Sequence, residues 1–487
     1  MDFLRQHIPE ILIAIDQILR LVLAIRVIMR RRPVGVSLAW LSVILIVPYA
    51  GAGLYLVFGE LRLGRRRADW LSKIHMPFEI WLFKLRERAE PIHWQTLGPE
   101  CEPLSKLVET TVNIPALPGN MWRLYSTTDE VFDEIVQDID AARSTCHREF
   151  YIWNVGGRAD DVADALIRAA ARGVTCRVLV DAVGSRPFLK SKQAAKLKES
   201  GIALHAALPG GLIRGLFVRF DLRLHRKIIV IDGEIAYTGS MNLVDPRCFK
   251  QNAGVGEWID AMTRIEGPAV EGLAVTFVED WELETSEGVE RLAKTSDIHP
   301  VSTRGAAVIQ AIPSGPLVQN DAIQQILLMA IYSARDQIVL TTPYFVPDES
   351  ILTALTTAVR RGVDVTLILP ETVDSRLVAL ASQAHQGDLI RAGVHVMLFE
   401  GGLLHTKSIT VDGQFSLFGS LNLDPRSLYL NFEITLAAYD VEFTAELRRL
   451  QATYISQSKP VSMEKRANRS SFRRLAENTA RLLGPLL

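Results

Sequence analysis

The chain has 487 residues, of which 48% are hydrophobic and 22% are charged, with 22 Pro and 32 Gly. This composition excludes disordered and collagen-like proteins, and the length suggests about three domains of ordinary size. The four cysteines lie far apart without a C-x-x-C pair, which argues against a disulfide framework and against a cysteine zinc site.

Charge is distributed unevenly along the chain. Residues 1–75 contain eleven Arg and Lys against five Asp and Glu, and residues 459–487 contain seven against two, so the middle is acidic. A nucleic-acid-binding protein would carry its basic surface on the folded body. Basic ends around an acidic centre instead favour contact with anionic lipid, and we expect no nucleic-acid partner.

The N-terminal region, residues 1–75, is expected to form membrane-associated helices. An uncharged apolar run extends from Pro33 to Gly59, and crossing a hydrocarbon core needs about 20 such residues. The preceding stretch, residues 8–29, is apolar but has its polar groups gathered on one side, which is typical of an amphipathic helix.

The topology of this region stays open, because arginines flank the apolar run on both sides. One alternative is a helical hairpin with two full spans. The other is an interfacial helix followed by a re-entrant segment, broken near Pro48, Gly51 and Gly53, with both arginine clusters on the cytoplasmic face.

Strand and helix patterns alternate after residue 120, which predicts an α/β fold. The order strand, helix, glycine, strand at residues 150–185 recurs at residues 338–375. The two helices end at Gly173 and Gly362, where a left-handed cap is easiest for glycine.

A sharper repeat closes each unit. The segment HRKIIVIDGEIAYTGSMN (225–242) aligns without gaps with HTKSITVDGQFSLFGSLN (405–422), with eight identities in eighteen positions. A single repeat at this long period indicates two fused homologous domains rather than a solenoid. We expect them to span residues 120–290 and 300–458 and to be related by a pseudo-twofold axis.

The repeated residues carry chemistry rather than core packing. Each motif supplies an imidazole, an ammonium, a carboxylate and two neutral donors: His225, Lys227, Asp232, Ser240 and Asn242 in the first, and His405, Lys407, Asp412, Ser420 and Asn422 in the second. Residues two apart on a strand face the same side. Asp232 and Asp412 begin Asp-Gly steps, which predict hairpin turns, so these two members of the catalytic motif are expected to fix the turns.

Two such motifs meeting across the axis would bring two histidines and two lysines around one phosphate. The lysines and neutral donors can neutralise the phosphate oxygens, and the histidines can divide the roles of nucleophile and general acid. No grouping of metal ligands is evident in the sequence. We therefore predict neither a metal nor a cofactor, with the lysines in the place of a divalent ion.

The double H-x-K-x4-D signature, each followed by G-S-x-N, resembles that of the phospholipase D superfamily. The flanking segments LYLVFGE, TPYFVPDES, FEGGLLHTK and NLDPRSLYLNFEI look like those of bacterial cardiolipin synthases along nearly the whole chain. The resemblance implies that two phosphatidylglycerol molecules give cardiolipin and glycerol through a phosphatidyl-histidine intermediate. It also implies location at the bacterial cytoplasmic membrane, with the catalytic domains on the cytoplasmic side.

The resemblance further implies a role for each site residue. His225 and His405 form the catalytic pair, and the glutamate of NFEI, Glu433, should orient His405. In the first half Gly254 lies at the corresponding place, so Asp260 is the nearest substitute and is expected beside His225. A hydrolytic phospholipase D, or a phosphatidyltransferase that uses another alcohol, would keep the same motif residues.

The C-terminal tail, residues 459–487, alternates basic with apolar side chains. The apolar residues Phe472, Leu475, Leu482, Leu483, Leu486 and Leu487 are interspersed with the basic residues Arg466, Arg469, Arg473, Arg474 and Arg481. This pattern predicts an amphipathic helix at the surface of an anionic membrane.

Overall fold

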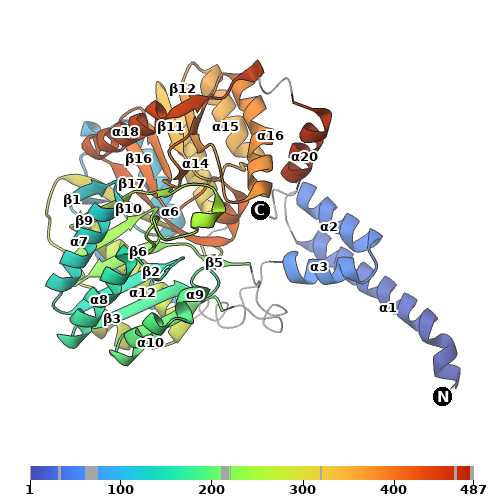
Figure 1. The fold of residues 1–487 in the computed structure, drawn as a ribbon, viewed down its shortest axis with the longest axis horizontal. Coiled ribbons are helices and arrows are strands. Elements are labelled where there is room, and N and C mark those ends of the chain that lie inside the picture. The colour runs from blue at the N-terminus through green and yellow to red at the C-terminus, as the bar shows by residue number, and fades with distance from the viewer. Residues whose placement is uncertain are drawn as a thin grey trace. The chain divides into compact units, whose positions relative to one another are not determined.

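The computed structural model describes residues 2–30, 34–60, 75–209, 219, 221–318, 321–464 and 469–482 (Figure 1). The chain divides into two compact units. The first contains residues 1–68 with 210–221, and the second contains residues 69–209 with 222–487.

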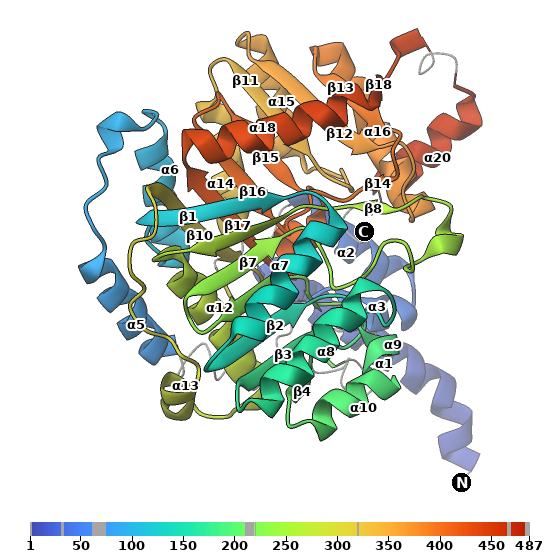
Figure 2. The same cartoon turned by 60° about the vertical axis from the view of Figure 1, so that its left-hand side comes forward.

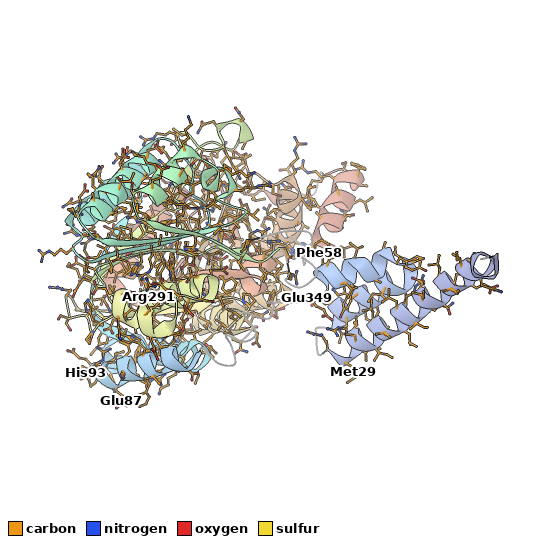
Figure 3. All side chains as sticks on the ribbon, turned by 90° about the horizontal axis from the view of Figure 1, so that it is seen from below. Met29, Phe58, Glu87, His93, Arg291 and Glu349 are labelled. Carbon is orange, nitrogen blue, oxygen red and sulfur yellow. The ribbon has the colours of Figure 1, made fainter. Side chains whose placement is uncertain are left out.

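The N-terminal unit is helical. Its helices are α1 (Asp2–Met29), α2 (Val34–Ile46) and α3 (Ala50–Phe58), and Figure 3 labels Met29 and Phe58 at two helix ends. The apolar run is interrupted between α2 and α3 at Pro48, because proline cannot donate the backbone hydrogen bond that would continue a helix. The break lies where the re-entrant alternative expects it, and the membrane topology of the run stays a prediction. Within the described ranges, none of the helices combines the length and apolarity that crossing a bilayer requires.

Charged side chains of this unit are turned inward. The buried Glu60 carboxylate accepts hydrogen bonds from Arg26 Nη2 at 2.8 Å and from the Tyr55 hydroxyl at 3.0 Å. The buried Asp16 carboxylate pairs with Arg20 and accepts a backbone hydrogen bond from Tyr49 at 3.0 Å. Large apolar side chains of α1 are exposed instead, among them Ile13, Ile18, Leu21, Ile25 and Ile28. The predicted amphipathic character of this helix is thus present. The arginines at 31–32 and 62–67 lie outside the described residues.

The second unit is built on a continuous sheet whose strand order is symmetric about a central antiparallel pair (Figure 2). That pair is β1 (Leu117–Tyr125) and β10 (Ala307–Ser314). From β1 outward the first half contains β9 (Met262–Glu266), β7 (Ile235–Gly239), β6 (Lys227–Ile231), β2 (Thr145–Phe150), β3 (Thr175–Asp181) and β4 (Ala203–Ala207). From β10 outward the second half contains β17 (Asn431–Tyr439), β16 (Phe415–Gly419), β15 (Ser408–Val411), β11 (Gln337–Thr341), β12 (Asp364–Pro370), β13 (His395–Phe399) and β18 (Ser458–Pro460).

Helices cover both faces of each half. In the first half, α7 (Thr128–Ala141), α8 (Arg158–Ala171) and α10 (Lys192–Glu199) share a core with the sheet, and α12 (Ala269–Thr285) packs on the other face, where Phe277 stacks on His147 of β2. In the second half, α6 (Cys101–Val112), α14 (Ala322–Ser333), α15 (Glu349–Arg360) and α16 (Arg376–Ala392) cover one face and α18 (Val441–Ser456) covers the other. The predicted α/β duplication is confirmed by this symmetry.

Shorter elements complete the unit. They are α5 (His75–Arg88), η1 (Trp94–Thr96), α9 (Arg186–Leu189), β5 (Arg223–Leu224), η2 (Gln251–Ala253), β8 (Trp258–Ile259), α13 (Val289–Thr295), β14 (Leu403–Leu404), α17 (Pro425–Tyr429) and α20 (Ser471–Leu482).

The two predicted glycine caps are present in the structure. Gly173 and Gly362 follow α8 and α15 with φ of 89° and 95°, conformations that favour glycine.

The two motif aspartates lie at hairpin turns and bind the backbone of the segment that precedes the neighbouring strand. Asp232 and Asp412 have φ of 52° and 50° and start the turns of the β6–β7 and β15–β16 hairpins. The Asp232 carboxylate accepts backbone hydrogen bonds from residues 143–145 at 2.8–3.1 Å, just before β2. Asp412 does the same for residues 335–337 before β11, at 2.7–2.9 Å. These contacts bear out the expected role of both aspartates at the turns, while their inclusion in the catalytic set stays a prediction.

We predict that Asp232→Ala and Asp412→Ala each lower the free energy of unfolding by about 1–3 kcal/mol, because three backbone donors lose a charged acceptor. Chemical denaturation of the purified variants measures this loss. Asp232→Asn should cost less, since asparagine keeps one acceptor oxygen and tolerates a positive φ. Loss of turnover in folded Asp232→Ala protein, without loss of stability, would contradict a structural role.

Candidate active site

The two motif histidines are buried where the halves of the sheet meet. His225 follows β5, which pairs in parallel with β17 of the second half, and its backbone N–H donates to the Phe432 carbonyl at 2.9 Å. His405 follows β14, which pairs in parallel with β8 of the first half, and its backbone N–H donates to the Ile259 carbonyl at 2.8 Å. Each histidine is therefore carried across to a strand of the opposite half.

This crossing determines the carboxylate partner of each histidine. His225 Nδ1 lies 2.7 Å from Glu433 Oε2, and His405 Nδ1 lies 2.7 Å from Asp260 Oδ1. The expectation that Glu433 orients His405 and that Asp260 serves His225 is therefore wrong. Glu433 and Asp260 are the correct carboxylates, but each acts on the histidine of the other half.

The sheet register identifies Asp260 as the counterpart of Glu433. In each half the glycine that ends the motif hairpin pairs with the residue two places after the carboxylate: Gly239 with Met262, and Gly419 with Thr435. Gly254, which the sequence alignment offered as the corresponding residue, lies in a loop with φ of 69°. The first half has more residues between its serine and its carboxylate, and this longer loop displaced the alignment.

The motif serines hold these carboxylates in place. Ser240 Oγ donates to Asp260 Oδ1 at 2.6 Å, and Ser420 Oγ donates to Glu433 Oε2 at 2.6 Å. Glu433 Oε1 also accepts from Ser427 Oγ at 2.8 Å and from Asn431 Nδ2 at 3.3 Å. In this structure the serines thus act through the carboxylates, whereas the sequence predicted that they complete the phosphate cradle.

The motif asparagines are also buried beside the site. Asn242 Oδ1 accepts a hydrogen bond from the Ile152 backbone at 3.1 Å, and its Nδ2 has no partner among the described residues. The amide oxygen of Asn422 is likewise without a partner within that part of the chain. The Nδ2 donor of Asn242 is available to a bound phosphate, whereas an amide oxygen such as that of Asn422 only accepts hydrogen bonds.

Both motif lysines are buried and point to the same region. Lys227 Nζ donates to the His225 carbonyl at 2.6 Å, and Lys407 Nζ donates to the His405 carbonyl at 2.5 Å. Burial lowers the pKa of Lys227 to about 8, against the opposing effects of the carboxylates of Glu433 and Asp260. Burial also lowers the pKa of Lys407 well below its usual range. A phosphate anion between them would favour the charged form of both lysines.

The carboxylates fix the tautomer of the histidines. Burial by itself raises the pKa of Asp260, but His405, Lys407 and Ser240 bring it down to about 2. For Glu433, burial is likewise outweighed by its cationic and hydrogen-bonding neighbours, so its pKa is lowered. An ionised carboxylate only accepts hydrogen bonds. Each histidine must therefore donate through Nδ1, which leaves Nε2 as the atom available for attack.

Burial also lowers the pKa of both His225 and His405 to about 4, although the partner carboxylates act in the opposite direction. The sequence-based argument that a carboxylate raises the histidine pKa is thus outweighed by desolvation of the buried imidazoles. Lys407 further lowers the pKa of His225, and Lys227 that of His405. This mutual influence means that the two motifs form one site with two neutral imidazoles at neutral pH.

Sequence reasoning missed the aromatic and ionic groups that pack around the histidines. The Tyr151 ring lies 4.9 Å from the His225 ring, and the Trp258 ring lies 4.5 Å from the His405 ring. Arg226 Nε donates to the Glu433 carbonyl at 3.0 Å, and its guanidinium pairs with Asp280. Arg226 lies between His225 and Lys227, which could have drawn attention to it. It is not a repeated residue, because the second motif has Thr406 at this position.

Comparisons with known proteins agree with this geometry. The family model "Cardiolipin synthase, PLD-like domain" matches residues 135–281 and 327–452, and a phospholipase D-nuclease N-terminal model matches residues 18–60. The chain is 45% identical over 463 residues to cardiolipin synthase A of Erwinia tasmaniensis, with 95% of each chain covered. It is 44% identical over the same length to cardiolipin synthase A of Yersinia pseudotuberculosis, again with 95% of each chain covered.

A solved structure shares the fold. The crystal structure of phosphatidylserine synthase from Haemophilus influenzae Rd KW20 superimposes with a TM-score of 0.58 at 14% identity, over 79% of this chain and 100% of that chain. Two homologous α/β halves that share one site with a pair of H-x-K motifs define a member of the phospholipase D superfamily, and the match to cardiolipin synthases makes it a phosphatidyltransferase. More specifically, the chain belongs to the cardiolipin synthase family.

The crossed pairing predicts which histidine responds to loss of each carboxylate. In protein labelled with ¹⁵N-histidine at neutral pH, Glu433→Gln should lower the Nδ1–H tautomer population of His225, because an amide no longer requires a donor. The ¹⁵N ring shifts of His405 should stay unchanged. Asp260→Asn serves as the matched control and should change only His405. A response of His405 to Glu433→Gln would contradict the crossing.

Proposed function

We propose that the chain transfers a phosphatidyl group from one phosphatidylglycerol molecule to another, giving cardiolipin and glycerol. The observation that carries this proposal is the composite site, in which two buried histidines face opposite-half carboxylates beside two buried lysines. Exchange of one phosphodiester for another conserves bond energy closely, so the chemistry needs no nucleotide. Membership of the cardiolipin synthase family supports the choice of substrates.

In the proposed first step, His225 Nε2 attacks the phosphorus of phosphatidylglycerol. A P–N bond forms as the P–O bond to glycerol breaks, and His405 gives its Nε2 proton to the departing glycerol oxygen. Lys227 and Lys407 neutralise the phosphate oxygens as charge develops. His405 must be protonated for this step, and the bound phosphodiester anion favours that state by raising the pKa of a nearby imidazole.

The proposed second step reverses these roles. Neutral His405 removes the proton from the terminal hydroxyl of a second phosphatidylglycerol, whose oxygen attacks phosphorus. The P–N bond to His225 breaks, cardiolipin leaves, and both histidines return to their starting states. Water must be kept from the intermediate, because hydrolysis would give phosphatidic acid instead.

The division of labour between the histidines follows from how each carboxylate is used. Glu433 shares its charge among His225, Ser420, Ser427 and Asn431, an arrangement that suits rigid orientation of a nucleophile. Asp260 accepts side-chain hydrogen bonds from His405 and Ser240 among the described residues. Because Asp260 accepts fewer of the described side-chain hydrogen bonds than Glu433, more of its negative charge is available to stabilise an imidazolium, which suits His405 as the proton donor. The resemblance to related enzymes also favours the first motif as nucleophile.

We further propose that the N-terminal unit attaches the protein to an anionic bacterial cytoplasmic membrane, with the catalytic unit on the cytoplasmic side. Support comes from the inverted polarity of that unit, where Glu60 and Asp16 are buried with arginine partners while many large apolar side chains are exposed. An apolar exterior with internally paired charges suits a hydrocarbon environment.

With phosphatidylglycerol as the sole lipid, in excess chelator and without cytidine nucleotide, the purified protein should produce cardiolipin and glycerol in equal amounts. Thin-layer separation of radiolabelled lipids measures the product. Phosphatidic acid as the main product would favour the hydrolase alternative. Dependence on CDP-diacylglycerol would contradict the proposed mechanism.

A second experiment tests the assignment of the histidines. With a phosphatidyl donor that has a good leaving group, His405→Ala should still accumulate phosphatidyl-enzyme, because departure no longer needs a proton. His225→Ala should accumulate none, since the attacking nitrogen is missing. Mass spectrometry of acid-quenched protein locates the adduct. Label found only in His225→Ala protein would reverse the two roles.

A further inference from the structure

The C-terminal helix α20 is docked on the catalytic unit. It lies side by side with α16 in Figures 1 and 2, although the two helices are far apart in sequence. Ala480 of α20 is buried in a small cluster with Ala381 of α16 and Val346. Arg473 Nη2 donates to Gln383 Oε1 of α16 at 3.2 Å.

The polarity of α20 is the reverse of what packing on a protein requires. Its buried residues are Glu477 and Ala480, whereas Phe472, Leu475 and Leu482 are 81%, 64% and 76% exposed. At about 100° per residue these three apolar side chains fall within roughly one quarter of the helix circumference, on the side away from α16. A helix of a soluble protein normally buries such a strip. The strip therefore lacks a covering surface within the described part of the chain.

A pocket of about 290 Å³ opens between α16 and α20, and two of its lining residues, Arg474 and Arg481, directly precede Leu475 and Leu482 of the strip in the sequence. Four guanidinium groups and two carboxylates line it: Arg391, Arg469, Arg474 and Arg481 with Asp388 and Glu477. None of the histidines, lysines or carboxylates of the catalytic site lines this pocket. It is thus a separate, basic site on the same unit.

Both carboxylates of the pocket are already engaged by arginines. Glu477 pairs with Arg469 and lies 3.4 Å from Arg473 Nε, and Asp388 pairs with Arg391. No ion pair of Arg474 or Arg481 occurs among the described residues. Two positive charges therefore remain for an incoming anion.

A further sign of uncompensated charge is the neighbouring His385 on α16. This side chain is buried, and its Nδ1 has no hydrogen-bond partner within the described residues. Burial lowers the pKa of His385 to about 4, and the positive charge of Arg481 adds to that effect. The Asp388 carboxylate acts in the opposite direction at His385, but its effect is smaller than that of Arg481.

We propose that the pocket between α16 and α20 binds the phosphate of an anionic phospholipid while Phe472, Leu475 and Leu482 enter the acyl layer. Arginine binds phosphate oxygens through paired N–H groups. An apolar strip next to those arginines is what an interfacial helix needs, because the headgroup and the acyl chains of one lipid layer meet both surfaces together. A free phosphate would use the arginines but would leave the strip uncovered.

The test follows α20 directly, so that attachment by the N-terminal unit does not obscure the result. Full-length protein with Cys248→Ser, which removes the exposed thiol, carries an environment-sensitive fluorophore on Leu475→Cys. It is reconstituted into phosphatidylcholine vesicles with or without phosphatidylserine, at low salt. Phosphatidylserine presents an anionic phosphodiester but no glycerol headgroup, so the readout does not depend on the proposed transfer reaction.

The fluorophore should shift to the blue and be quenched by spin-labelled acyl chains when phosphatidylserine is present. Arg474→Gln combined with Arg481→Gln should raise the phosphatidylserine content needed for half the shift by about tenfold or more. The matched control, Lys192→Gln with Lys198→Gln on α10, removes the same charge from another surface and should not change the response. Arg474→Lys with Arg481→Lys should restore part of it, which excludes misfolding as the cause.

Three outcomes would overturn the proposal. The fluorophore could stay in water at every phosphatidylserine content. The α10 control could lose as much response as the pocket variant, which would reduce the effect to general surface charge. Calorimetry on the detergent-solubilised chain could show binding of inorganic phosphate that depends on Arg474 and Arg481, without any response to vesicles. That last result would assign the pocket to free phosphate.

Discussion

Two hydrogen bonds between opposite halves organise the centre of this molecule: His225 with Glu433, and His405 with Asp260. Neither half can build a complete site alone, because each contributes its histidine to one pair and its carboxylate to the other. The short parallel pairings of β5 with β17 and of β14 with β8 bring the partners together. The antiparallel pairing of β1 with β10 joins the two halves of the sheet, so that β5 and β14 can each reach a strand of the opposite half.

The same crossing makes a buried cluster of charges tolerable. Unpaired ions in a protein interior are destabilising, and removing one partner of a buried pair typically costs about 3–5 kcal/mol. Here Lys227 and Lys407 donate to backbone carbonyls, while Glu433 and Asp260 are ionised and accept from histidine and serine. The two imidazoles are the neutral members of the cluster, because burial lowers their pKa more than the partner carboxylates raise it. Two buried lysines and two carboxylate-bound imidazoles suit an anion, whose binding would favour the charged forms of both histidines and both lysines.

Local patterns in the sequence predicted which residues form the site. Which carboxylate binds which histidine depends on the pairing of strands that are far apart in the sequence. The gap-free repeat identified the motif residues, and the Asp-Gly and glycine-cap patterns correctly predicted turns and helix ends. The crossing of Glu433 to His225 could not be predicted, because it depends on pairing between strands about two hundred residues apart. The misplaced Gly254 has a simpler cause, since an insertion between Ser240 and Asp260 shifts a sequence alignment but leaves the hairpin register of the sheet unchanged. In the N-terminal unit, the apolar run did not by itself decide between a continuous helix and one broken at Pro48, and the structure has the break between α2 and α3.

Both histidines bind a carboxylate through Nδ1 at the same distance. A difference in role between them must therefore come from the residues that surround these two pairs. Arg226, between His225 and Lys227, binds the Glu433 carbonyl and pairs with the buried Asp280. Its counterpart Thr406 reaches the Ile259 carbonyl at 3.3 Å and the Tyr454 hydroxyl at 3.0 Å. Both side chains brace the opposite half next to its carboxylate, but one does so with charge and the other with neutral hydroxyls. Burial lowers the pKa of Lys227 to about 8 and that of Lys407 well below its usual range, and Lys227 itself contributes to the shift of Lys407, so the two lysines belong to one charged cluster rather than to separate halves. The buried Arg226–Asp280 ion pair, which lies beside His225 where the second half has Thr406, is therefore the difference in charge that distinguishes the surroundings of the two histidines.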